Sequence, residues 1–132
     1  METYLIDTTV LVEHLRGNRH AKRFLEKFPV FVSHVSVAEL IQGTPNKLHL
    51  KTIDRFLHDL VLLPLNQAIS VKALGLMKQF FHSHRLEYLD ALIAATALQE
   101  HLSFVTANMK HFYFIPGLSV IDWKKMEEVH HD

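Results

Sequence analysis

The chain has 132 residues, of which 48% are hydrophobic and 21% are charged, a size that suits one compact core and is short for two ordinary domains. Lysine plus arginine equals aspartate plus glutamate at 14 each, so no global field directs the chain towards nucleic acid or a membrane. The absence of cysteine excludes disulfide frameworks and thiolate chemistry. We therefore expect a single domain spanning residues 1–132.

The N-terminal stretch METYLIDTTVLVEHL is interrupted by the acids Glu2, Asp7 and Glu13. This pattern fits neither a signal peptide nor a membrane span. We expect a cytoplasmic protein with no membrane partner.

The first half of the chain alternates short β-branched runs with helical patterns. TYLID is typical of a strand and precedes TTVLVEHL, where Thr8 or Thr9 can cap a helix. Pro29 ends the next helical pattern, and Ser36 is placed to cap the helix that follows the second strand. The predicted elements are a strand at 3–7, helices at 8–15 and 19–28, a strand at 30–35 and a helix at 37–43.

The second half continues the alternation, with amphipathic patterns between short apolar runs. Strands separated by helices indicate βαβ units, in which a parallel sheet is covered on both faces. The fold class predicted is therefore α/β. The elements expected here are helices at 47–60, 67–82 and 86–98, and strands at 61–65, 103–107 and 118–122.

Three polar residues, Asp7, Glu39 and Asn108, lie where ligands bind in such sheets, at or beyond the carboxyl ends of strands. A fourth, Asp90, opens the most apolar helix of the chain, where a carboxylate needs a partner. Each also has an ordinary structural explanation. Asp7 can cap a helix, Glu39 can face solvent, and Asn108 can form a turn. Asp90 can oppose the helix dipole, but that effect is only roughly 0.3 to 1 kcal/mol and is smaller than the cost of burying a carboxylate without a partner.

Several carboxylates at one end of a parallel sheet would repel one another unless a cation lay between them. Oxygen ligands suit Mg²⁺ or Mn²⁺, whereas zinc normally takes histidine or cysteine. The pattern therefore favours a hard divalent cation. Motifs for other chemistries, such as GxSxG, the phosphate-binding GxxxxGK[ST] and GxGxxG, are absent from the sequence.

Four segments together resemble the motifs of PIN-domain nucleases, in the family's order: LIDTTVLVEHL, SHVSVAELIQG, LDALIAATAL and FVTANMKHF. DALIAATAL is the most specific of them. The resemblance runs from Tyr4 to about Phe112 and is strongest to the VapC-type toxins of toxin–antitoxin modules. Two positions depart from the family's pattern, because Thr9 stands where asparagine or serine is commoner and His111 stands where an acid is often found.

The resemblance implies a three-layer α/β/α sandwich around a parallel sheet, and an endoribonuclease dependent on Mg²⁺ or Mn²⁺. It assigns catalysis and metal binding to Asp7, Glu39 and Asp90, with Asn108 as a further metal ligand. It gives Thr8, Ser36 and Thr106 a part in shaping the site. It also implies an antitoxin partner and a homodimer. The products of similar enzymes carry a 5′ phosphate and a 3′ hydroxyl.

RNA attraction must come from local charge, and RGNRHAKRFLEK is the most basic segment. Its cations are either RNA contacts or an ordinary solvated helix face. An alternative function is a catalytically weakened PIN module that binds RNA or protein in a regulatory complex. A response-regulator-like domain is disfavoured, since the first strand offers only Asp7. The candidate RNA-binding residues are Arg16, Arg19, Lys22 and Arg23.

Overall fold

The computed structural model describes residues 3–129, which contain one five-stranded sheet. All neighbouring strands are parallel, in the order β3-β2-β1-β4-β5. The parallel α/β sheet expected from the sequence is thereby confirmed. The strands are β1 (Tyr4–Ile6), β2 (Val30–Ser33), β3 (Val61–Leu63), β4 (Ser103–Thr106) and β5 (Val120–Asp122).

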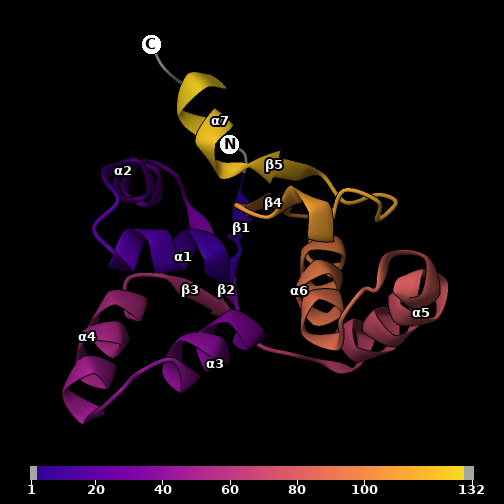
Figure 1. Cartoon of the computed structure of the whole chain (residues 1–132), viewed down its shortest axis with the longest axis horizontal. Helices are drawn as coiled ribbons and strands as arrows, with labels where there is room; N and C mark the ends of the chain where they lie inside the picture. Colours follow the sequence, from indigo (N-terminus) through magenta and orange to yellow (C-terminus); the bar gives the residue numbers. More distant parts are fainter. Residues whose placement is uncertain (1–2, 130–132) are drawn as a thin grey trace.

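Helices cover both faces of this sheet, which gives the predicted three-layer α/β/α arrangement (Figure 1). No helix in residues 3–129 is long and apolar enough to cross a membrane. The helices are α1 (Thr8–Leu15), α2 (Arg19–Lys27), α3 (His34–Gln42), α4 (Lys47–Leu57), α5 (Gln67–His84), α6 (Tyr88–Gln99) and α7 (Trp123–Val129), with a short 3₁₀ helix η1 (Met109–His111).

Alternation along the strands divides the core into two clusters, as the two-residue repeat of a strand requires. Leu5 and Phe104 pack with α5 and α6, whereas Tyr4, Ile6 and Val105 pack with α1, α2, α4 and α7. In helix α6 every residue from Ala91 to Ala97 is buried. The most apolar helix of the chain therefore belongs to the interior, and Asp90 stands at the end of that buried run.

The strand order reverses direction at β1. The chain runs outward from β1 to β2 and β3, then returns to place β4 on the other side of β1. The loops that leave the carboxyl ends of β1 and β4 consequently diverge to opposite faces, which opens a crevice where α/β proteins bind ligands. Asp7 directly follows β1, and Ala107 directly follows β4.

Several predicted boundaries were wrong. Strand β2 ends at Ser33 rather than residue 35, and Ser33, not Ser36, caps α3 by accepting the Ser36 N–H at 3.1 Å. Of the caps that the sequence offered for helix α1, Asp7 is the one found, and Thr8 and Thr9 are not. Helix α7 and η1 were not predicted; α7 buries Trp123 and Met126 in the cluster that includes α1 and α2.

Candidate active site

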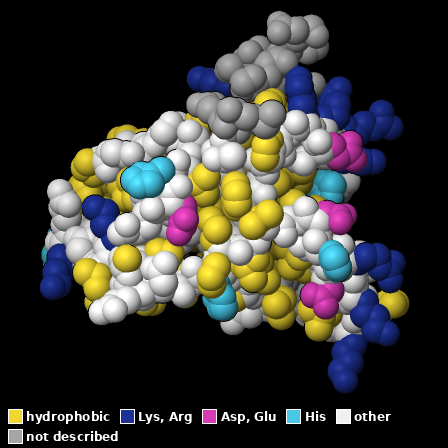
Figure 2. All heavy atoms as spheres, turned by 180° about the vertical axis from the view of Figure 1, so that it is seen from behind, with side chains coloured by type: hydrophobic (Ala, Val, Ile, Leu, Met, Phe, Trp, Pro, Cys, Tyr) yellow, Lys and Arg dark blue, Asp and Glu magenta, His cyan; other side chains and the backbone are white. Residues whose placement is uncertain are grey.

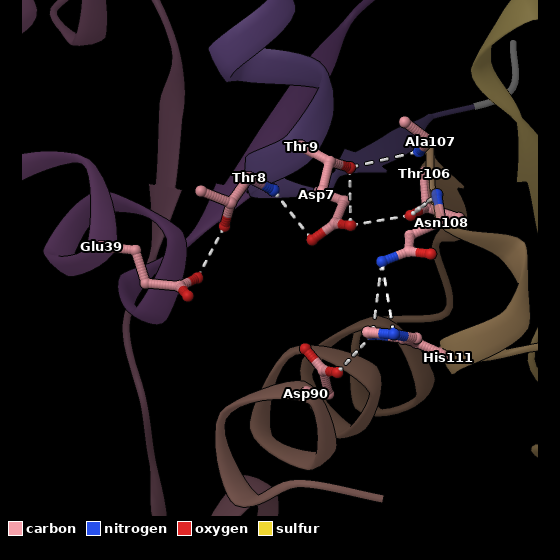
Figure 3. A network of polar contacts seen from close by, with 9 residues as sticks. All are labelled: Asp7, Thr8, Thr9, Glu39, Asp90, Thr106, Ala107, Asn108 and His111. Carbon is pink, nitrogen blue, oxygen red and sulfur yellow. Dashed lines mark hydrogen bonds and ion pairs between the residues drawn. The ribbon is translucent and has the colours of Figure 1, made fainter. Parts of the chain in front are cut away.

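Asp7 is the centre of the site, and its carboxylate is held by three donors. Oδ1 accepts the backbone N–H of Thr8 at 2.8 Å, while Oδ2 accepts the hydroxyls of Thr9 at 2.9 Å and Thr106 at 2.7 Å. The first two follow from the helix cap, and the third joins residues 99 positions apart because β1 pairs with β4. The side chain therefore has one fixed orientation at the switch point of the sheet (Figure 3).

Burial dominates the electrostatics of Asp7, which is only 4% exposed. Loss of solvation raises the pKa of this carboxyl above its usual value of 3.8, although the hydrogen bonds from Thr106, Thr9 and Thr8 and the nearby His111 oppose the rise. Three hydrogen bonds thus do not fully replace water for this charge. A cation beside Asp7 would supply the missing stabilisation.

The two threonines beside Asp7 are themselves fixed by backbone groups of the loop after β4. Thr9 accepts the N–H of Ala107 at 3.2 Å, and Thr106 accepts the N–H of Asn108 at 2.9 Å. Each hydroxyl therefore donates to the carboxylate while accepting from this loop. The loop that carries Asn108 is therefore hydrogen-bonded to Thr9 and Thr106, the side chains that orient Asp7.

Glu39 reaches the site through Thr8. The Thr8 hydroxyl lies 2.7 Å from Glu39 Oε1 and 2.8 Å from the hydroxyl of buried Ser36, which in turn lies 3.3 Å from the Ser33 hydroxyl. Because a carboxylate only accepts, Thr8 donates to Glu39. Glu39 is thus held at one side of the crevice by a threonine whose backbone N–H contacts Asp7.

Asp90 approaches from the opposite side, on the first turn of α6. Its Oδ2 lies 3.1 Å from His111 Nδ1, and the ring of His111 lies 3.4 Å from the amide nitrogen of Asn108. Burial raises the pKa of Asp90, and the negative charge of Asp7 raises it further, against the opposing effect of His111. The charge of Asp7 therefore acts on Asp90 across the crevice.

The site suits a hard divalent cation in its chemistry. The charge of Asp7 raises the pKa of Asp90, and a cation between the two carboxylates would oppose that effect. The donors are oxygen atoms, as Mg²⁺ and Mn²⁺ prefer. Within residues 3–129, however, no three acidic, histidine or cysteine side chains are gathered closely enough to form a metal-binding cluster, and Glu39 and Asp90 are engaged by Thr8 and His111.

The sequence-predicted site residues largely meet in one network. Figure 3 shows side chains from α1, α3, α6 and the loop after β4 directed towards a common space. The members predicted from sequence are Asp7, Thr8, Ser36, Glu39, Asp90, Thr106 and Asn108.

The candidate RNA-binding cations lie outside this network, at the end of α1 and on α2. Arg16 lies 3.9 Å from half-buried Glu13, and Lys22 lies 4.0 Å from exposed Glu26. Figure 2 shows lysine and arginine side chains along the edge of the molecule that carries α2 and α4. These cations therefore belong to the surface formed by the end of α1 and by α2.

Sequence reasoning assigned no role in the site to Thr9, His111 or Ser33. Thr9 stands two residues after Asp7, a spacing at which a hydroxyl can bond back to a carboxylate at a helix start. His111 stands three residues after Asn108, which places both on one 3₁₀ turn. Ser33 precedes Ser36 by the spacing of a helix cap. Local spacing could therefore have indicated all three.

Replacing Thr106 with valine is expected to lower the free energy of unfolding by about 1 to 3 kcal/mol. The change keeps the volume but removes the donor to buried Asp7 and the acceptor for the Asn108 N–H. Urea denaturation measures the effect, and Thr96→Val is the control. Thr96 is equally buried but donates only to the Leu92 carbonyl within α6, so equal losses in both variants would contradict a special role for Thr106.

Comparison with known proteins agrees with the geometry. The family model described as "PIN domain" matches residues 4–115. A protein of Mycobacterium tuberculosis named Ribonuclease VapC10 is 35% identical over 113 residues, covering 82% of this chain and 84% of that protein. Ribonuclease VapC19 of the same organism is 29% identical, covering 86% and 95%.

Among solved structures, a toxin–antitoxin complex from Klebsiella pneumoniae superimposes with a TM-score of 0.78 at 26% identity, covering 91% of this chain and 97% of that one.

Proposed function

Because this chain belongs to the PIN-domain family, we propose that it is a metal-dependent endoribonuclease that hydrolyses RNA phosphodiester bonds, acting as the toxin of a toxin–antitoxin module. Relatives named as VapC ribonucleases support the reaction, and structural similarity to a toxin–antitoxin complex supports the biological setting. The observation that carries the proposal is the fixed Asp7 carboxylate facing Asp90 at the switch point of the sheet.

In this function, Asp7 and Asp90 would hold Mg²⁺ or Mn²⁺ directly, and Asn108 would add an amide oxygen from the loop after β4. When bound, the cation lowers the pKa of a coordinated water and neutralises charge on the phosphate oxygens. Glu39, held by Thr8 at 2.7 Å, would hold the cation through water or orient the attacking water. Thr106 and Thr9 keep the Asp7 carboxylate directed at the crevice.

Hydrolysis by this set of residues needs no covalent nucleophile. Water would attack the phosphorus in line with the leaving oxygen, as in other phosphoryl transfers. The products expected are a 5′ phosphate and a 3′ hydroxyl. They distinguish the reaction from cleavage by attack of the RNA's own 2′ hydroxyl, which leaves a cyclic phosphate.

A second candidate is a PIN module with weakened catalysis that binds RNA or protein. The observation that favours it is the ring of His111 beside Asp90, 3.1 Å from Oδ2, because a side chain there competes with a cation for the carboxylate. The polar support of Asp7 by Thr8, Thr9 and Thr106 favours the nuclease.

The experiment is to incubate the purified chain with a mixed pool of structured and single-stranded RNA in Mg²⁺, Mn²⁺ or EDTA, and to map product ends. Cutting that requires the metal and leaves 5′ phosphates supports the nuclease. Binding of RNA without cutting under all three conditions would support the weakened module instead. Cutting that persists unchanged in EDTA would contradict metal dependence.

The antitoxin is proposed to bind the groove between α3, α4 and the β2–β3 edge. A cavity of about 590 Å³ there combines apolar and charged side chains. Apolar side chains offer buried area, and the charged ones offer specificity for a protein segment. The residues that line the cavity include Val32, Val37, Lys51, Arg55, Leu57 and Leu62.

A homodimer is the second assembly that we propose. Strand β3 is an edge of the sheet, and its Val61 is about half exposed. Figure 2 shows a broad hydrophobic area in the middle of one face of the molecule. Such areas commonly mark interfaces, and sedimentation equilibrium of the isolated chain tests this state.

Charge reversal of α2 tests its role in RNA contact. Because Arg19 and Arg23 are exposed, Arg19→Glu with Arg23→Glu is expected to raise the KM for RNA about tenfold or more at low salt, with less effect at high salt. Cleavage rates at a series of salt concentrations measure this. Cleavage that is unchanged across the series would leave α2 as an ordinary solvated surface.

A further inference from the structure

A second cavity, of about 210 Å³, opens beside Asp90. It is formed where three segments meet: the C-terminal end of α5, the start of α6, and η1. Two of the residues that line it, Asp90 and His111, also belong to the polar network of the candidate active site. The cavity is therefore continuous with the proposed reaction centre.

Two strong cations, Arg85 and Lys110, line this cavity from segments 25 positions apart in the chain. Arg85 ends α5 in the left-handed conformation, with φ of 56°, and its guanidinium lies 5.4 Å from the ring of Phe81. This contact restrains a long side chain without neutralising it. Both side chains are exposed, and within residues 3–129 neither forms an ion pair.

Two acids, Asp90 and Glu87, line the same cavity, and each could neutralise the cations there. Asp90 faces His111 and lies within electrostatic reach of Asp7, so in the proposed enzyme its charge is directed to the cation. Glu87 is the N-cap residue of α6, and its side chain makes no capping hydrogen bond. The positive charge of Arg85 and Lys110 is consequently opposed mainly by one exposed acid.

Aromatic rings pack against His84, the residue that precedes Arg85. His84, which also lines the cavity, stacks on Phe114 with a centroid distance of 4.1 Å and an angle of 18°. Tyr113 packs edge-on to both rings, at 6.1 and 5.6 Å, and is 64% exposed. A large exposed ring beside cations is the combination with which proteins bind single-stranded nucleic acid, by stacking on bases and pairing with phosphates.

We propose that this cavity, which we term the flanking-phosphate pocket, binds the phosphate of the nucleotide next to the scissile bond in single-stranded RNA. Arg85 and Lys110 contact the phosphate oxygens, and Tyr113 stacks on the adjoining base. This inference rests on the proposed nuclease function, because it places the scissile phosphate at Asp7 and Asp90. The RNA strand then crosses the crevice with one of its neighbouring phosphates held beside α6.

The first test measures binding of a 12-nucleotide single-stranded RNA by fluorescence anisotropy in EDTA, where metal-dependent cutting cannot occur. The variant is Arg85→Gln with Lys110→Gln, and the control is Lys72→Gln with Lys78→Gln, which removes the same charge from exposed positions of α5. We expect the Kd to rise at least tenfold in the variant and less than twofold in the control. The slope of log K against log salt should shrink by about 0.7 for one lost phosphate contact.

The second test identifies the phosphate. Once the cleavage site has been mapped, RNAs carrying a single neutral methylphosphonate on either side of it are compared as substrates. With the wild-type chain, one flanking substitution should raise KM about as much as the double variant does. With the double variant the same substitution should have no further effect, because the contact is already lost.

The outcomes separate this pocket from the proposed function. The pocket is overturned, and the nuclease is not, if the wild-type chain cleaves RNA and the double variant has an unchanged Kd. The same conclusion follows if the methylphosphonate raises the KM of the double variant by the same factor as it raises that of the wild type. Weaker RNA binding by the variant without cleavage by the wild-type chain supports RNA binding here and overturns the nuclease. Tyr113→Leu is expected to raise the Kd about fivefold or more, whereas Tyr113→Phe should not, since stacking needs only the ring.

Discussion

Replacing Asp7 with asparagine is expected to reduce RNA cleavage at least about a thousandfold, which corresponds to roughly 4 kcal/mol of transition-state stabilisation. Asparagine removes the negative charge that would hold the cation but keeps the shape of the side chain. Its oxygen can still accept the Thr8 N–H, and its amide can donate to the hydroxyls of Thr9 and Thr106, whose oxygens lie at 2.9 and 2.7 Å. The fold should therefore survive the loss of activity.

Single-turnover cleavage in saturating Mn²⁺ measures this effect, and circular dichroism with urea denaturation checks the fold. Asp90→Asn should reduce cleavage similarly, because α6 brings Asp90 to the other side of the crevice. Asp59→Asn is the matched control, since Asp59 is an exposed acid near the end of α4. Wild-type rates in both site variants would show that the activity belongs to a contaminant or to another site.

The second large effect expected is on the free energy of unfolding, which should change with pH and with the presence of a divalent cation. Burial raises the pKa of both Asp7 and Asp90 above 3.8 in the folded chain, so between these pKa values and 3.8 the folded state binds more protons than the unfolded state. Stability contributed by this protonation is complete below pH 3.8 and is lost as the pH rises through the folded-state pKa values. At neutral pH, without metal, the two charges therefore destabilise the fold.

The measurement is a melting temperature series from pH 3.5 to 7.5 in EDTA for wild type and Asp90→Asn. Asp90→Asn should melt higher near pH 7, and the difference should close as the pH approaches 3.8. Because the two chains share all their other titratable groups, the difference between their melting temperatures removes the contribution of those groups. A constant difference at all pH values would contradict a raised pKa at Asp90.

A divalent cation should make the wild type melt at a higher temperature than Asp90→Asn, which is the reverse of the order expected in EDTA. At a free concentration of 100 times its Kd, a ligand that binds only the folded state adds about 2.7 kcal/mol, which for a chain of this size raises the melting temperature by on the order of 10 °C. We expect this gain from Mn²⁺ in the wild type at pH 7.5 and little of it in Asp90→Asn. Equal gains in both chains would place the metal elsewhere.

The sequence predicted the elements well where local pattern and tertiary packing agree. Parallel strands buried on both faces give short apolar runs, such as YLI of β1 and the central FV of β4, and these strands were found. The cap of α3 was misplaced because SHVS offers two serines three residues apart. The choice of Ser33 depends on where β2 stops pairing with β3, and that is a tertiary property.

Most residues of the candidate site could be predicted from the sequence, but the hydrogen bonds that join them could not. Position after a strand indicated Asp7, Glu39 and Asn108, a carboxylate in the most apolar helix indicated Asp90, and the resemblance to a family gave these residues their roles. The hydrogen bond from Thr106 to Asp7 spans 99 residues and depends on the register between β1 and β4. The contact of His111 with Asp90 depends on how η1 folds over the start of α6, which residue spacing does not determine.

The central position of β1 also has a consequence for when the site around Asp7 forms during synthesis. The ribosome makes β1 first, but the strand that completes its other side, β4, follows almost a hundred residues later. Such long-range pairing is slow to form, and a nascent chain that ends before Thr106 and Asn108 cannot fasten Asp7 from that side. The full set of hydrogen bonds around Asp7 can therefore form only after synthesis has reached Asn108.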